Sequence, residues 1–189
     1  MAAWQMAAAA ALASFFPQAL SAQTCLARVE AMVNEVRAAA FPEISRAELR
    51  VRAFASNSDY FRAIFAWRRF VFGLPMRYAI LANPRQCTLQ APEEGVRGIV
   101  AHELAHVLYY KRGSRLHLTG LVRMTSPRWR SRFERAADAT AISRGFGPGL
   151  KAYRQWLYPN VPPDKLREKL RDYLSPDEID AAARARPSP

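Results

Sequence analysis

Two histidines and a glutamate stand close together in the segment HELAH at residues 102–106. In an α-helix, residues four apart lie one turn apart on the same face, so His102 and His106 can present imidazole nitrogens to one metal ion. Glu103 lies beside them, angled so that its carboxylate reaches a metal-bound water rather than the metal. This is the arrangement of the HExxH zinc site, with the glutamate as general base. The alternative is an alanine-rich helix whose histidines simply pack, but two of the three histidines of the chain lie in this motif.

A catalytic zinc usually takes three protein ligands and leaves one position for water. The extended pattern HExxHxxGxxH is excluded, because Tyr and Arg stand at positions 109 and 112. The remaining histidine, His117, follows the motif closely in an arginine-rich connection. A better source is the segment RFERAADATAISRG, where Glu134 and Asp138 stand four apart on one helical face. One carboxylate would complete the metal site, and the other would accept a hydrogen bond from the second nitrogen of a ligating histidine. The alternative is a helix whose acidic residues form surface ion pairs with neighbouring arginines.

An HExxH motif followed by ExxxD on a later helix resembles the gluzincin metallopeptidases. It is most similar to the group that contains the heat-shock membrane peptidase HtpX and the CAAX-prenyl endopeptidases. The matching segments are HELAH at 102–106 and ERAAD at 134–138. The resemblance implies that His102, His106 and Glu134 bind Zn²⁺. It also implies that Glu103 is the catalytic base and that Asp138 orients His102. The similarity is confined to this stretch, so the substrates of the membrane enzymes are not carried over.

Such a site predicts zinc-dependent hydrolysis of peptide bonds in a peptide or protein substrate. Glu103 would take a proton from the metal-bound water and later pass it to the leaving amine. The developing oxyanion needs a second hydrogen-bond donor. The candidates are His117, Tyr110, Tyr109 and Tyr158, and the sequence does not choose among them. We expect the substrate to lie along a sheet edge formed by the segment MRYAILA, which precedes the zinc helix.

The first residues, MAAWQMAAAAALASFFPQALSAQ, contain no charged side chain. An apolar run followed by proline and small residues predicts a secretory signal peptide over residues 1–22, although no basic residue stands at its start. The run is shorter than the roughly 20 apolar residues of a membrane span, which disfavours an uncleaved anchor. We therefore expect an exported protein, periplasmic or secreted. In an oxidising compartment Cys25 and Cys87 would form a disulfide, the alternative being two separate buried thiols.

A length of 189 residues suits a single domain, here residues 23–189, with a sizeable core. Hydrophobic periodicity predicts a first helix with Leu26, Val29, Val33 and Val36 on one stripe. The segments ELRVRAFA and MRYAILANP are typical of strands, whereas DYFRAIFAWRRFVFG fits either a helix or a strand. Five further helices are expected over 92–112, 126–144, 149–158, 163–174 and 175–184. These elements predict a mostly helical α+β fold in which a small antiparallel sheet precedes the HExxH helix, and the resemblance implies that this domain is zincin-like.

The formal net charge is +12, and only four of the 28 basic residues are lysine. The arginines are scattered and belong to no recognisable nucleic-acid-binding module, so we expect no nucleic-acid partner. The excess is either a compositional habit of the source genome or the basis of a weak association with an acidic envelope surface. Two functions therefore compete with the peptidase. One is a zinc-stabilised, non-catalytic binding or regulatory protein of the cell envelope, and the other is a basic surface-binding module.

Overall fold

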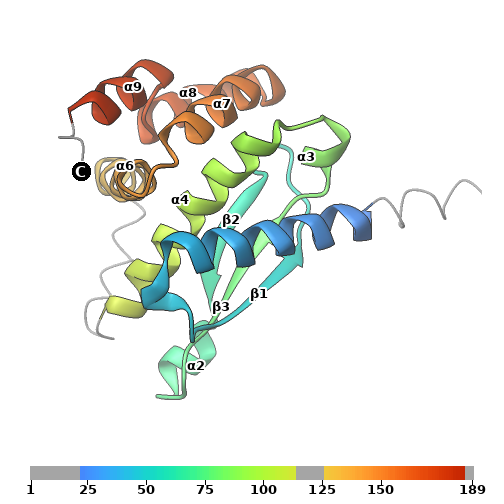
Figure 1. Cartoon of the computed structure of the whole chain (residues 1–189), viewed down its shortest axis with the longest axis vertical. Helices are drawn as coiled ribbons and strands as arrows, with labels where there is room; N and C mark the ends of the chain where they lie inside the picture. Colours follow the sequence, from blue (N-terminus) through green and yellow to red (C-terminus); the bar gives the residue numbers. More distant parts are fainter. Residues whose placement is uncertain (1–21, 114–125, 186–189) are drawn as a thin grey trace, which may run out of the picture.

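The computed structural model describes residues 22–113 and 126–185, which form a mostly helical α+β fold with one small sheet (Figure 1). The predicted fold class is therefore confirmed. A helix over residues 22–40 comes first. The elements that follow it are η1 (Pro42–Ile44), β1 (Glu48–Ala53), β2 (Phe61–Phe65), α2 (Trp67–Val71), β3 (Arg77–Ala82), α3 (Arg85–Thr88), α4 (Glu93–Arg112), α6 (Pro127–Ser143), α7 (Gly147–Leu157), η3 (Tyr158–Asn160), α8 (Pro163–Asp172) and α9 (Pro176–Arg184).

The three strands lie in the order β1-β3-β2. Strand β3 pairs antiparallel with β2 but parallel with β1, so the sheet is mixed rather than wholly antiparallel as expected. After β1 the chain forms β2 at the opposite edge of the sheet. Strand β3 then inserts between β1 and β2 and becomes the central strand. The expectation that MRYAILA forms a sheet edge is therefore wrong. A run of buried residues, Tyr78 to Ile80, suits this central position, because neighbouring strands shield both edges of β3 from solvent.

The ambiguous segment DYFRAIFAWRRFVFG contains both a strand and a helix. Its first half forms β2, where Phe61 and Ala63 are buried and Arg62 between them is exposed, the alternation of a half-buried strand. Its second half forms the short helix α2, in which no residue is buried. Strand β2 lies at one edge of the sheet and packs beside α4. The edge nearest the predicted metal motif is thus β2.

The apolar face of the sheet packs against helices in one core. The first helix contributes the predicted stripe, with Val29, Val33 and Val36 buried in the same cluster as Ile80 of β3 and Leu104 of α4. The predicted disulfide is also confirmed, since Cys25 is bonded to Cys87. Because this bond ties the first helix to α3, it fixes the chain just before α4 begins. The disulfide therefore helps to place the helix that carries HELAH.

Helix α4 is flanked by the residues that favour its two ends. Pro92 stands at the N-cap, Glu93 and Glu94 lie in the first turn, and basic residues occupy the last turn. Helix α7 approaches α4 closely, because a Cβ on Gly98 would lie 2.2 Å from the backbone nitrogen of Leu150. This close approach brings the side chains of α7 directly behind α4.

The helices of the C-terminal half lie within two residues of their predicted bounds. Ser175 and Glu178 form a capping box at the start of α9. None of the described helices is long and apolar enough to cross a membrane. The predicted signal segment and His117 fall largely or wholly in 1–21 and 114–125, outside the described residues.

Candidate metal centre

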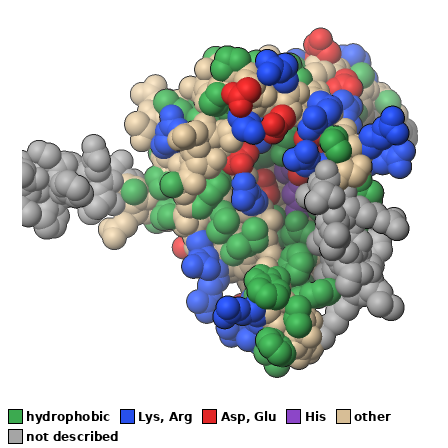
Figure 2. All heavy atoms as spheres, turned by 180° about the vertical axis from the view of Figure 1, so that it is seen from behind, with side chains coloured by type: hydrophobic (Ala, Val, Ile, Leu, Met, Phe, Trp, Pro, Cys, Tyr) green, Lys and Arg blue, Asp and Glu red, His purple; other side chains and the backbone are tan. Residues whose placement is uncertain are grey.

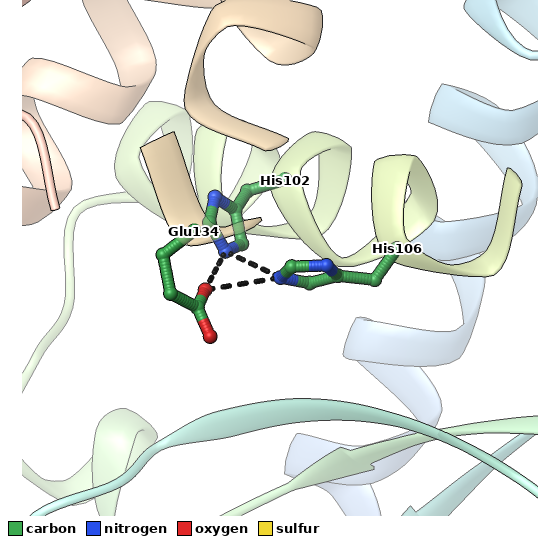
Figure 3. A group of neighbouring side chains, drawn as sticks. All are labelled: His102, His106 and Glu134. Carbon is green, nitrogen blue, oxygen red and sulfur yellow. Dashed lines mark hydrogen bonds and ion pairs between the residues drawn. The ribbon is translucent and has the colours of Figure 1, made fainter. Parts of the chain in front are cut away.

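His102, His106 and Glu134 converge on one point between α4 and α6 (Figure 3). Glu134 Oε2 lies 3.1 Å from His102 Nε2 and 3.0 Å from His106 Nε2, and the two imidazole nitrogens are 3.1 Å apart. A tetrahedral ion with bonds of about 2.0–2.1 Å separates its ligands by roughly 3.3–3.4 Å. The three atoms therefore need to move by only a few tenths of an ångström to hold such an ion. This group could hold a metal ion.

Aromatic packing fixes His106 in this position. The ring of Phe133, one residue before Glu134 on α6, stacks on His106 at a centroid distance of 4.5 Å. Tyr110, one turn further along α4, stacks at 6.3 Å from the same imidazole. Small residues on α6, Ala137 and Ala141, are buried where this helix faces the core. The two helices thus approach closely enough for one carboxylate to reach both histidines.

His102 is fixed by a hydrogen bond on its other nitrogen. Its Nδ1 lies 2.7 Å from Oδ1 of Asp138, which is completely buried. Because a carboxylate accepts hydrogen bonds, Asp138 fixes a proton on Nδ1 of His102, so Nε2 is the nitrogen that can face a metal. Asp138 also accepts hydrogen bonds from Arg154 Nη2 at 2.9 Å and from the backbone N–H of Leu174 at 2.8 Å. The carboxylate is therefore held by α4, α7 and the connection that follows α8.

These buried charges shift the pKa values of the site. Burial alone would lower the pKa of His102, but the carboxylates of Asp138 and Glu134 raise it to about 10. Burial would likewise raise the pKa of Asp138, but the charges of Arg154 and His102 lower it overall. Glu134 follows the same pattern, because the two histidines outweigh its burial and lower its pKa well below the ordinary value. The pKa shifts therefore show that the carboxylates of Glu134 and Asp138 favour positive charge at the histidines.

Glu103 lies beside the three convergent residues, but it takes no part in the contacts that hold His102 and His106 in place. It is buried, and its Oε2 accepts a hydrogen bond of 2.5 Å from the backbone N–H of Ala63 on β2. Burial raises the pKa of this carboxyl above its usual value, although the nearby histidines oppose the shift. A carboxylate that one hydrogen bond holds in place, and whose pKa is raised, suits proton transfer.

A cleft of about 390 Å³ opens in front of the convergent residues. Its walls come from β2, α4, α6 and α8, and they include Ala63, Glu103, His106, Glu134 and Tyr173. Figure 2 shows histidine and acidic side chains recessed between the C-terminal helices and the lower part of the molecule. The site is thus accessible to a molecule larger than water.

Of the proposed oxyanion donors, Tyr110 lines this cleft, and burial raises the pKa of its phenol strongly, so it stays protonated. Tyr109 lines a neighbouring cavity instead, and Tyr158 belongs to η3, outside the lining of the cleft. His117 is outside the described residues. A residue that the sequence did not suggest, Tyr173, also lines the cleft, with its ring centroid 5.7 Å from that of His102.

Two other contributions were not predicted. Arg154 shares one helical stripe with Leu150, Tyr153 and Leu157, and all four residues are buried. An arginine at such a position signals a buried ion pair, so the pattern could have revealed it. The Ala63 N–H is a backbone group, and no side-chain pattern could have indicated it.

Compared with known proteins, the chain matches no family model, and no curated protein or solved structure is significantly similar to it.

Proposed function

We propose that this protein is an exported, zinc-dependent peptidase of the gluzincin type. One observation carries the proposal: His102, His106 and Glu134 converge at about 3 Å, and the carboxylate of Glu103 stands beside them in an open cleft. Two imidazoles and one carboxylate form a ligand set typical of catalytic zinc. A structural zinc site would instead close the fourth position with a further protein ligand.

The residues around the site have distinct roles in this mechanism. When bound, a zinc ion supplies Lewis acidity, which lowers the pKa of water and polarises a carbonyl oxygen. Glu103 accepts the proton of the attacking water and transfers it to the amine that leaves. Its hydrogen bond with Ala63 N–H holds the carboxylate toward the cleft. Tyr110 and Tyr173 line the cleft and are the described phenols available to stabilise the oxyanion.

The same cleft supports a peptide as substrate. Strand β2 is an edge strand, and Phe61, Arg62 and Ala63 line the cleft. An extended peptide can pair with such an edge through its main chain. We therefore assign substrate alignment to β2 rather than to the central strand β3.

The disulfide supports the localisation. A bond between Cys25 and Cys87 persists in an oxidising compartment and is rare in a reducing cytosol. Together with the uncharged apolar segment at the start of the sequence, it supports export to the periplasm or the exterior.

The test compares metal content and peptide cleavage in three proteins. Wild type should carry about one zinc per chain and cleave casein or a peptide library, and a chelator should stop cleavage. Glu134→Ala should lose the metal. Glu103→Gln should keep the metal and lose at least about a hundredfold in cleavage rate, because only the proton acceptor is removed.

Glu94→Gln is the matched control, since Glu94 is an exposed glutamate on the same helix. It should behave as wild type. Zinc binding without any cleavage would favour the non-catalytic binding protein. Full cleavage by Glu103→Gln would refute the mechanism.

A further inference from the structure

The segment between β2 and β3 presents a group of large apolar side chains to solvent. Trp67, Val71, Phe72 and Leu74 are 64%, 60%, 76% and 45% exposed. Among the described residues, one other large hydrophobic side chain, Leu170 on α8, is comparably exposed. Figure 1 shows that α2 projects from the end of the sheet opposite the C-terminal helices, and Figure 2 shows hydrophobic side chains gathered at this end. We refer to residues 66–76 as the α2 tip.

The α2 tip is anchored from its inner side. Phe70 packs edge-to-face on Phe65 at 5.8 Å, and Phe65 packs on Tyr110 of α4 at 5.1 Å. Arg69 Nε donates a hydrogen bond of 2.7 Å to the carbonyl of Pro75, which braces the turn. Phe70 thus anchors the segment from the inner side, whereas Trp67, Val71 and Phe72 are mostly exposed.

Arginines lie in α2 and extend from one side of this apolar group along β1. Arg68 belongs to α2, and Arg50 and Arg52 lie on the face of the sheet that points away from the core. Within residues 22–113 and 126–185, Arg52 and Arg68 form no ion pair, and Arg50 contacts Glu48 only at 3.6 Å. Glu48 is already paired with Arg77 at 2.6 Å. The area around the tip is therefore positively charged as well as apolar.

We propose that the α2 tip and the adjacent arginines dock the protein on bilayers that contain anionic lipids. Tryptophan and other aromatic side chains favour the headgroup level of a bilayer, and arginines beside them are attracted to a negative surface. One apolar element combined with a basic patch is the pair of signals that reversible membrane binding needs.

The test is flotation with vesicles of equal parts phosphatidylglycerol and phosphatidylcholine, compared with phosphatidylcholine alone. The protein should float with the anionic vesicles, and added salt should weaken the binding. Trp67→Ser combined with Phe72→Ser should reduce the partition coefficient about tenfold or more, because two inserted side chains are lost. Arg52→Gln combined with Arg68→Gln should also reduce it about tenfold or more.

Exposed residues at the opposite end of the molecule supply matched controls. Leu170→Ser removes an exposed apolar side chain from α8, and Arg167→Gln with Arg184→Gln removes two exposed arginines that form no ion pair within the described ranges. These variants should float like wild type. Equal loss in the control and tip variants would overturn the proposal, and so would undiminished flotation of the Trp67/Phe72 variant, which would place binding elsewhere in the chain. Self-association through the tip without vesicle binding would overturn it as well.

This inference does not depend on the peptidase proposal. Glu103 lies away from the α2 tip, so the Glu103→Gln protein should float like wild type whether or not the protein cleaves peptides.

Discussion

Two regions of this molecule use arginine and aromatic residues in opposite ways. Behind the metal centre, Arg154 is 1% exposed, donates to the buried carboxylate of Asp138, and lies 4.4 Å above the ring of Tyr173. At the α2 tip, Arg68 and Trp67 are exposed, and within the described ranges Arg68 has no acidic partner. The first region pairs its buried arginine with a buried carboxylate. The second exposes its arginines and apolar side chains to solvent.

The difference separates residues that hold the fold from residues that are free to bind something else. A buried charge whose partner is removed costs several kcal/mol, so substitutions behind the metal centre should destabilise the protein. An exposed side chain without a specific partner contributes little to stability, so substitutions at the tip should leave the fold intact. Measurements of stability can therefore test the assignment of each region before any ligand is known.

The largest effect is expected for Arg154→Met, which leaves the Asp138 carboxylate buried without its cation. We expect the free energy of unfolding, measured by urea denaturation, to fall by about 3–5 kcal/mol. Because Asp138 also orients His102, zinc affinity in a chelator competition should fall by about tenfold. Arg167→Met on α8 is the control and should change the unfolding free energy by less than about 0.5 kcal/mol.

A double variant separates the ion pair from general packing. If the pair is the cause, adding Asp138→Asn to Arg154→Met should cost less than the sum of the two single variants. Strict additivity would contradict the assignment of Arg154 as the partner that holds Asp138.

Much of the fold and the approach of the metal residues were predictable because local signals agreed. Pro92 and the Ser126-Pro127 pair mark helix starts, and the spacing of four puts each residue pair on one face. The expectation that HELAH and ERAAD meet came from the three ligands that a catalytic zinc needs and from the resemblance to the gluzincins. The structure brings their side chains to within about 3 Å of one another.

The strand order and the edge that faces the cleft could not be predicted from local patterns. Period-two alternation identifies β1 as a strand, and the segment that forms β3 is also typical of a strand. Neither pattern says that β3 inserts between the two earlier strands. The hydrogen bond from the Ala63 N–H to Glu103 could not be predicted either, since every residue except proline carries such a group. These features depend on contacts between segments far apart in the sequence.

A smaller effect is expected at Glu43, which lies between the two extremes because it is paired but partly exposed. Its carboxylate accepts hydrogen bonds from Arg144 at 2.8 Å and from Arg112 at 2.9 Å, joining η1 to α4 and α6. The Arg144 hydrogen bond is the main cause that lowers the pKa of Glu43 from 4.5 to about 2. A depressed pKa stabilises the folded state above pH 4.5, and this contribution disappears as the pH falls toward 2.

Glu43→Gln should therefore lower the free energy of unfolding by at most about 1 kcal/mol at neutral pH, since solvent screens a partly exposed pair. The difference from wild type should shrink between pH 4.5 and 2, as measured by urea denaturation at each pH. A constant difference across this range would show that Glu43 acts through packing rather than charge.

The smallest effect is expected at the α2 tip and completes the contrast with Arg154. Trp67→Ser combined with Phe72→Ser should change the free energy of unfolding by less than about 0.5 kcal/mol, because both side chains are mostly exposed. Phe70→Ser in the same helix should be clearly destabilising, since Phe70 packs on Phe65. Urea denaturation of the two variants side by side measures the difference. If the exposed pair proves as costly as Phe70, the tip is held by its outer side chains, and they are not free to insert into a membrane.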